Sequence, residues 1–217
     1  AHELKTPLTS VIGYLTLLHD EKSIRPELQD KYLGIALRKS ERLEELINEF
    51  FEMTKYNFSN TVLSISKVNL SLMLEQLIFE FKQIFQEKSV DCQTDIQPDL
   101  TISCDVEKME RVFDNLFKNA YNYCYENTTI HVHVKSSPMD DGVILIIQNA
   151  GKTIPKEMLD HLFEQFFRMD SSRSSKTGGT GLGLAIAREI ITLHHGTITC
   201  GSENETITFT VFLPKTP

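Results

Sequence analysis

The sequence predicts an α+β protein in which an antiparallel helical hairpin precedes an α/β sandwich domain. Residues 1–20 and 26–56 each repeat apolar side chains every three or four positions, which is the spacing of an amphipathic helix. From about residue 62 onward, apolar helical patterns mix with short runs rich in β-branched residues. Interleaved helices and strands joined by hairpin-like connections are typical of an α+β sandwich.

Each helix of the predicted hairpin carries a continuous apolar stripe. The first has a heptad seam formed by Leu4, Leu8, Val11, Leu15 and Leu18. The second has a stripe of Ala36, Leu43, Leu46, Phe50 and Met53, widened by Leu33, Leu37, Ile47 and Phe51. The polar stretch 20–27 fits the loop between antiparallel helices. Two helices cannot bury such wide stripes alone, so we expect the hairpin to be half of a homodimeric four-helix bundle.

A break at residues 57–61 separates a hairpin domain, 1–57, from a larger domain, 58–217. Three helical patterns are predicted in the larger domain, at residues 71–88, 105–125 and 181–195. Four strand-like runs accompany them, at residues 128–136, 143–148, 196–201 and 206–213.

Charge and cysteine content narrow the possible functions. With 30 acidic against 22 basic residues, the formal net charge is −8, which disfavours nonspecific binding to nucleic acid or to an anionic membrane surface. The four cysteines form no C-x-x-C pair, which argues against a zinc knuckle and favours a reducing, cytosolic setting. No apolar run reaches the length of a membrane span. The chain starts without methionine, directly at a dense motif, so we expect an N-terminally truncated fragment.

His2 is predicted to point outward from the first helix. At 3.6 residues per turn it falls about 160° from the heptad seam, with Thr6 one turn later on the same face and Glu3 to the side. Neutral imidazole is a competent nucleophile near pH 7, because its unperturbed pKa is about 6.5. For an isolated histidine, an ordinary surface position on an amphipathic helix is the alternative interpretation.

Three asparagines share one face of the helix predicted at 105–125. Asn115, Asn119 and Asn122 recur at helical spacing beside Lys118, although asparagine is a mediocre helix former. Their amide oxygens suit magnesium, which prefers oxygen ligands and often bridges substrate phosphates. A solvated polar face is the alternative explanation of the same pattern.

Several later segments could surround a polyphosphate. The stretch 149–155 follows an apolar strand-like run, and the aromatic stretch 163–168 ends in an arginine. The serine-rich stretch 169–177 carries two cations and suits a mobile lid. The stretch 178–184 then opens a helix, where small residues and unpaired N–H groups let phosphate approach. Taken singly, the aromatic stretch could be a core cluster and the glycine-rich stretch a flexible hinge.

In this order the segments resemble the H, N, G1, F and G2 boxes of sensor histidine kinases. The run His2-Glu3-Leu4-Lys5-Thr6-Pro7-Leu8 is similar to the H box residue for residue. Three positions depart from the family pattern: Asn122 replaces a frequent lysine, Asn149 replaces an aspartate, and Thr153 replaces a glycine. The first helix and the run N-A-G-K-T-I-P are similar to the VanS group of sensor kinases of vancomycin resistance.

The resemblance implies a role for each motif position. His2 would accept a phosphoryl group, Glu3 would act as its general base, and Thr6 would orient water for dephosphorylation of the partner. Asn119 would hold magnesium. The implied nucleotide contacts are Asn115, Lys118, Asn119, Asn122, Tyr123, Asn149, Gly151, Ile154, Phe163, Arg168, Lys176, Gly179, Thr180, Gly181, Leu182, Gly183, Leu184 and Thr208. The departures predict a weaker phosphate contact at Asn122 and an adenine hydrogen bond at Asn149 without the charge of an aspartate.

The resemblance also implies an activity and partners. The domain 58–217 would be an ATP-binding domain of the histidine kinase/Hsp90-like type, with ATP and Mg²⁺ as cofactors. The chain would phosphorylate itself, pass the group to an aspartate of a VanR-like response regulator, and dephosphorylate that regulator. It would be a homodimer and the cytoplasmic portion of an inner or plasma membrane sensor, attached through a part that precedes it, and would not bind nucleic acid. An ATPase of the same superfamily and a non-catalytic dimerisation scaffold remain as alternatives.

Two pairs of histidines could suggest a transition metal. His131 and His133 share a strand face, and His194 and His195 end a predicted helix. Neither pair has partners at ligand spacing, so we expect a polar strand face and a helix C-terminal cation, and no transition metal.

Overall fold

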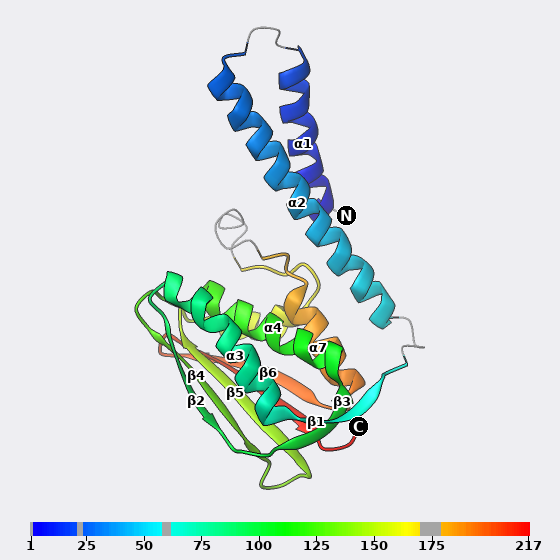
Figure 1. Cartoon of the computed structure of the whole chain (residues 1–217), viewed down its shortest axis with the longest axis vertical. Coiled ribbons are helices and arrows are strands. Elements are labelled where there is room, and N and C mark those ends of the chain that lie inside the picture. Colours follow the sequence, from blue (N-terminus) through cyan, green and yellow to red (C-terminus); the bar gives the residue numbers. More distant parts are fainter. Residues whose placement is uncertain (1, 21–23, 58–61, 170–178) are drawn as a thin grey trace. The chain divides into compact units, whose positions relative to one another are not determined.

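The structure is a computed structural model that describes residues 2–20, 24–57, 62–169 and 179–217, without the side chains of 2–3 and 55–57. Contacts divide the chain into two compact units, Ala1–Ser59 and Asn60–Pro217. Figure 1 shows a helical hairpin in the first unit and a sheet with helices in the second. The division lies close to the sequence break at residues 57–61.

The first unit consists of α1 (His2–Asp20) and α2 (Pro26–Asn57), which pack on each other as a hairpin (Figure 1). Pro26 suits the first turn of α2 because its fixed φ is helical and its missing N–H has no helical partner there. Between the helices, the rings of Tyr14 and Tyr32 lie with centroids 5.5 Å apart. Burial along α2 is greatest on one stripe, at Ala36, Leu46 and Met53. The predicted stripe is therefore buried at these three positions, whereas Phe50, also predicted on it, is 37% exposed.

A second apolar stripe on the hairpin is exposed in the single chain. Its large side chains are between 37% and 60% exposed, and they are Leu8, Ile12, Leu15, Leu33, Leu37, Ile47 and Phe51. A continuous exposed apolar stripe is uncommon on a monomer and marks a surface for association. A four-helix bundle made of two hairpins would bury it.

The second unit is built on a five-stranded sheet in the order β2-β4-β5-β7-β6. Its strands are β2 (Asp91–Ile96), β4 (Thr129–Ser136), β5 (Gly142–Ala150), β6 (Thr197–Glu203) and β7 (Thr206–Pro214). β2 pairs with β4 in parallel, and all other pairs are antiparallel. A separate two-stranded sheet joins β1 (Ile65–Asn69) to β3 (Thr101–Asp105).

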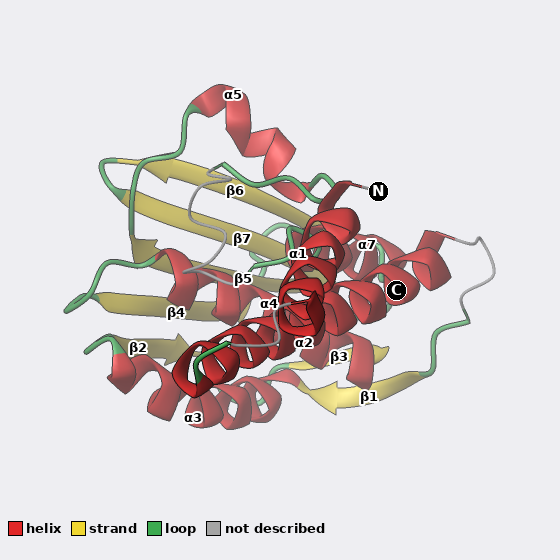
Figure 2. Cartoon of the chain, turned by 90° about the horizontal axis from the view of Figure 1, so that it is seen from above, coloured by secondary structure: helices red, strands yellow, loops and turns green. Residues whose placement is uncertain are grey.

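Three helices cover one face of this sheet: α3 (Leu70–Glu87), α4 (Val106–Tyr123) and α7 (Gly183–Leu193) (Figure 2). The short α5 (Lys156–Leu159) and the 3₁₀ helix η1 (Asp160–Phe163) follow β5. Burial alternates along β4, β5 and β7, so inward side chains such as Ile147 and Phe209 meet the helices. The opposite face of the sheet carries partly exposed side chains, including His131 and His133. The structure thus confirms the α+β class with a helical hairpin and a sandwich domain.

Three strands, β1, β2 and β3, were not predicted. They are five or six residues long, and β1 and β2 have no strictly alternating buried face. Hydrophobic periodicity therefore gave no signal for β1 and β2, and β3 alternates only over residues 101–104. Among the described residues, no helix is long and apolar enough to span a membrane.

Candidate functional site

Helix α4 places the predicted asparagines on its half-exposed side. The helix begins at its N-cap Asp105, whose carboxylate accepts a hydrogen bond from the Lys108 amide. One side is anchored in the core by fully buried side chains, namely Met109, Val112, Phe113, Leu116, Phe117 and Ala120. Helical geometry therefore turns Asn115, Asn119 and Asn122 away from the core centre, where all three are half-buried.

Asn115 meets the start of α7. Its side-chain Nδ2 is buried without a hydrogen-bond partner, and its Oδ1 lies 2.9 Å from the position that a Cβ on Gly183 would occupy. Only glycine leaves room for this approach. The close contact brings a buried unpaired amide to the N-terminus of a helix.

The N-terminus of α7 offers backbone donors for an anion. In the described part of the chain it has no side-chain cap, so its first N–H groups have no intrahelical acceptor. Gly181 has φ +76°, and a Cβ there would come within 3.0 Å of the Phe166 backbone. The Phe166 amide donates to the Gly181 carbonyl at 2.8 Å, and the Thr180 hydroxyl accepts from the Leu182 amide at 3.2 Å. These contacts hold the backbone around Gly181 in the conformation from which α7 begins.

Lys118 is on the same side of α4 but has a local partner. Its ammonium lies 2.7 Å from the Asp114 carboxylate, four residues earlier, and 61% of its side chain is exposed. An exposed pair of this kind contributes little stability and opens readily. Lys118 can therefore turn toward an anionic ligand at small cost.

At the end of β5, Asn149 is 2% exposed and its Oδ1 has no hydrogen-bond partner. Its amide Nδ2 donates to the Ala150 carbonyl at a long distance of 3.5 Å. Next to it, a Cβ on Gly151 would fall 2.5 Å from the Tyr123 carbonyl oxygen. The loop therefore packs directly on the C-terminal end of α4 and holds an unpaired acceptor in a buried position, which is costly unless a ligand completes it.

The loop after Asn149 is held to the β6–β7 turn by hydrogen bonds. The Gly151 amide donates to the Glu205 carbonyl at 2.8 Å, and the Glu205 amide donates to the Thr153 hydroxyl at 2.9 Å. The Ile154 amide donates to the Ser202 hydroxyl at 2.9 Å. Thr153, which replaces a glycine of the resembled motif, thus gives the loop a fixed attachment.

Thr208 does not belong to this pocket, contrary to the sequence prediction. It pairs with Gln148 across β5 and β7, and the Gln148 amide donates to its hydroxyl at 3.2 Å. Because successive side chains of a strand alternate, Thr208 lies on the face opposite Asn149. The residue paired with Asn149 is Ile207, which is 4% exposed and whose Cδ1 lies near Gly151. The sequence interpretation therefore missed Ile207, which lies beside Asn149 and Gly151.

Phe163 is a core residue in the structure. It is 5% exposed, its ring meets the Phe209 ring edge-on at 6.4 Å, and the Arg188 guanidinium lies 5.7 Å above it. The alternative of an aromatic core cluster, left open from the sequence, therefore describes this residue.

The remaining residues predicted to contact the nucleotide differ in their exposure. Ile154 and Leu182 are buried, Leu184 and Arg168 are half-buried, and a Cβ on Gly179 would have open space around it. Lys176, with the rest of the predicted lid, lies outside the described residues, as do the side chains of His2 and Glu3. Thr6 is exposed on α1, in the hairpin unit.

The described residues fit an adenine nucleotide. The Asn149 Oδ1 can accept a hydrogen bond from an exocyclic amino group, while the Asn115 amide and the uncapped α7 N-terminus can donate to phosphate oxygens. Within the described ranges, no group of three or more His, Cys, Asp and Glu side chains could hold a metal ion.

Comparisons with known proteins agree with this geometry. Residues 104–217 match the model of the histidine kinase-, DNA gyrase B- and HSP90-like ATPases, which is half of the chain. The chain belongs to this ATPase family. Residues 1–57 match the His Kinase A (phospho-acceptor) domain, so the ATPase domain follows a phospho-acceptor hairpin, as expected for the core of a sensor histidine kinase.

The sensor protein VanSC of Enterococcus gallinarum is 49% identical over 99% of this chain, and VanS of Enterococcus faecium is 43% identical over 100%. The chain spans 59% and 56% of these relatives. The histidine kinase ThkA, solved in complex with the response regulator protein TrrA, superposes with a TM-score of 0.79 at 26% identity, covering 100% of this chain and 60% of that one. The chain is therefore similar to the VanS sensor proteins in sequence and to the histidine kinase ThkA in fold.

Proposed function

We propose that the chain is the cytoplasmic core of a membrane sensor kinase that transfers the γ-phosphoryl group of ATP to His2. The phosphoryl group would pass to an aspartate of a VanR-like response regulator, which the chain would also dephosphorylate, in the control of vancomycin resistance. One observation supports this most: the buried Oδ1 of Asn149 and the buried Nδ2 of Asn115 have no hydrogen-bond partner, the second lies beside the N-terminus of α7, and the same chain carries a phospho-acceptor hairpin. A plain ATPase would have no use for that hairpin.

In the proposed reaction an imidazole nitrogen of His2 attacks the γ-phosphorus. A nitrogen–phosphorus bond forms, the bond from that phosphorus to the β,γ-bridging oxygen breaks, and ADP leaves with the electron pair. Glu3 would take up the imidazole proton. Thr6, which is exposed one turn later on α1, would orient water for hydrolysis of the regulator's phosphoaspartate.

The nucleotide would be held at two ends. Asn149, Gly151, Ile154 and Ile207 would bind the adenine, and the absence of a charge on Asn149 would make that hydrogen bond weaker than one to an aspartate. Asn115, Lys118 and the α7 N-terminus, with the glycines before it, would bind the phosphates. Asn119 would be the protein ligand of Mg²⁺, which neutralises charge on the phosphates when bound.

Two further proposals concern partners and location. The exposed apolar stripe of the hairpin, with Leu8, Leu37 and Phe51 among its members, would be buried in a homodimeric four-helix bundle. The membrane would be reached only through a part of the protein outside this chain.

Incubation with γ-labelled ATP and Mg²⁺ tests the activity. We expect a label on the protein that is acid-labile and base-stable, as a phosphohistidine is, and that disappears in His2→Gln while nucleotide binding is retained. An Asn119→Ala variant should lose label through loss of the metal. Release of labelled phosphate without labelled protein would instead favour an ATPase, and nucleotide binding with neither label nor release would favour a scaffold.

A further inference from the structure

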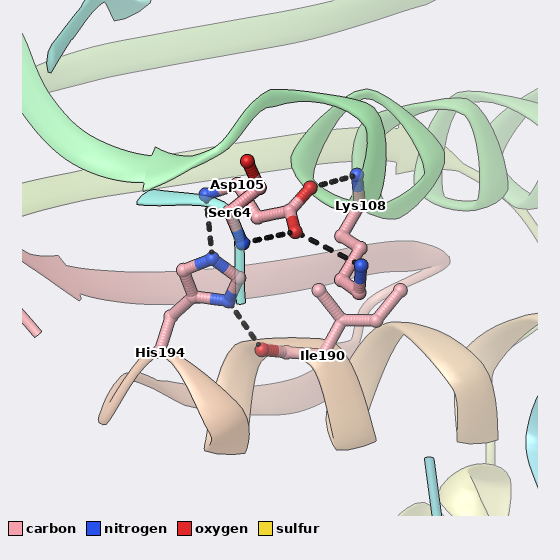
Figure 3. Close-up of polar contacts among 5 residues, drawn as sticks. All are labelled: Ser64, Asp105, Lys108, Ile190 and His194. Carbon is pink, nitrogen blue, oxygen red and sulfur yellow. Dashed lines mark hydrogen bonds and ion pairs between the residues drawn. The ribbon is translucent and has the colours of Figure 1, made fainter. Parts of the chain in front are cut away.

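A buried polar cluster joins the C-terminus of α7 to the N-terminus of α4 (Figure 3). His194 follows the last residue of α7 and is 2% exposed, and Asp105 is the N-cap of α4 and is 3% exposed. The Asp105 amide donates to His194 Nε2 at 3.0 Å. The other ring nitrogen, Nδ1, lies 2.8 Å from the Ile190 carbonyl oxygen in the same helix.

These two contacts determine the protonation of His194. A carbonyl oxygen only accepts, so Nδ1 carries a hydrogen, and an amide N–H only donates, so Nε2 presents its lone pair. The imidazole is therefore neutral, and the expectation of a helix C-terminal cation is wrong for His194. Burial lowers its pKa below the usual value, although the Ile190 bond and Asp105 raise it and Lys108 and His195 lower it further.

The Asp105 side chain extends this cluster to two more groups. One carboxylate oxygen accepts from the Lys108 amide, and the other accepts from the Ser64 amide at 3.0 Å and from the Lys108 ammonium at 2.9 Å (Figure 3). Ser64 directly precedes β1. Asp105, through its side chain and its backbone amide, therefore connects the start of α4 to the end of α7 and to the residue before β1.

Two contacts define how α7 lies along α4. His194 at the end of α7 meets Asp105 at the start of α4, and Gly183 at the start of α7 meets Asn115 farther along α4. The helices are thus antiparallel, and the two contacts are roughly 15 Å apart at 1.5 Å per residue. The second contact is the phosphate end of the proposed nucleotide site. A change at His194 can therefore shift the α7 N-terminus relative to Asn115.

We propose that His194 is a positioning residue that fixes the register of α7 on α4, and so the spacing between the α7 N-terminus and the Asn115–Asn119 face where phosphates bind. This inference rests on the proposed nucleotide site. It assigns His194 no contact with the nucleotide. The adenine end, formed by Asn149 and the loop after it, is attached to β6 and β7 and does not depend on this register.

The test compares ATP with adenosine in three variants. His194→Phe leaves the Asp105 amide without its acceptor, while the Ile190 carbonyl still accepts from the backbone amide of residue 194. In His194→Gln the side-chain oxygen can still accept from the Asp105 amide. His195→Asn is the matched control, because His195 is exposed with φ +57° and asparagine tolerates that conformation. Affinities are measured by calorimetry at a temperature where circular dichroism shows each variant folded.

We expect His194→Phe to weaken ATP binding on the order of tenfold, as for loss of one buried hydrogen bond, while adenosine binds as in the wild type. His194→Gln should recover most of the ATP affinity, and His195→Asn should not change it. Equal losses for ATP and adenosine, or no loss in folded His194→Phe, would overturn the inference. Failure of the wild type to bind ATP would instead refute the proposed nucleotide site. If His194→Phe does not fold, His194→Leu, which also removes the acceptor of the Asp105 amide, replaces it in the same comparison of ATP with adenosine.

Discussion

The two ends of the proposed nucleotide site are held in different ways. At the adenine end, the loop after Asn149 is bonded through Thr153 and Ile154 to the β6–β7 turn, so its position follows from the sheet. At the phosphate end, α7 and α4 meet through a glycine and an asparagine side chain, and their relative position follows from helix packing.

This difference indicates that the two ends of the site have different roles in binding. Backbone hydrogen bonds to a sheet resist displacement, whereas a helix can slide or rotate slightly on its neighbour at small cost. We therefore infer that the adenine end supplies constant affinity and that the phosphate end responds to changes elsewhere in the domain. Substitutions at the two ends should accordingly separate ATP binding from adenosine binding.

The largest effect is expected for Gly183→Ala. Alanine normally stabilises a helix relative to glycine, but its Cβ here would lie 2.9 Å from Asn115 Oδ1. The added Cβ would push the end of the Asn115 side chain away from the α7 N-terminus, so ATP affinity should fall about tenfold or more with adenosine binding preserved. Gly201→Ala is the control, because a Cβ at Gly201 meets nothing within 4 Å. Unchanged ATP affinity in calorimetry would show that this contact does not shape the phosphate end.

Asn149→Ala should weaken the binding of ATP and of adenosine by the same factor, about tenfold, because a buried hydrogen-bond acceptor for the base is lost. Gln148→Ala is the matched control on the opposite face of β5, where the structure places Thr208. Competition binding with both ligands measures the two factors. A loss confined to ATP would mean that Asn149 does not contact the base.

A smaller effect is expected at Thr153. Thr153→Val removes the hydroxyl that accepts from the Glu205 amide. Loss of this one exposed hydrogen bond should lower the affinity for ATP and for adenosine about threefold. Thr153→Ser should bind as the wild type does. Hydrogen exchange of the Glu205 amide reports the loosened attachment directly, and unchanged exchange in Thr153→Val would contradict this account of the loop.

The smallest effect is on stability at acid pH. Burial lowers the pKa of His194, so the unfolded chain binds a proton first and the free energy of unfolding falls as the pH drops below about 6.5. Burial alone would raise the pKa of Asp105, but bonds from Lys108 and Ser64 lower it, which adds a further loss at lower pH. Urea unfolding between pH 7.5 and 5 should therefore show a decline that is shallower in His194→Gln. Parallel curves would contradict a neutral His194.

Periodicity predicted the features that one helix determines by itself. The asparagine face of α4 and the inner stripe of α2 follow from 3.6-residue spacing, and the structure places both as expected except at Phe50. Local glycine patterns likewise located the start of α7, because a helix N-terminus is specified by neighbouring residues.

Features that depend on strand register or on contacts between distant residues could not be predicted from periodicity. Thr208 was assigned to the pocket because a strand motif does not say which face it presents, and a register shift of one residue exchanges it with Ile207. The bond from Glu205 to Thr153 joins residues 52 positions apart, and that from Asp105 to His194 joins residues 89 apart. The expectation of a cation at the end of α7 was wrong for His194, because its contacts with the Asp105 amide and the Ile190 carbonyl depend on folding.

Calorimetric titration of Mg-ATP into the wild type and into Asn149→Ala tests the two-ended site most directly. We predict that ATP binds at one site per chain. The substitution should weaken the binding of ATP and the binding of adenosine by the same factor, about tenfold. No heat of binding from a wild-type protein that circular dichroism shows to be folded would contradict the account.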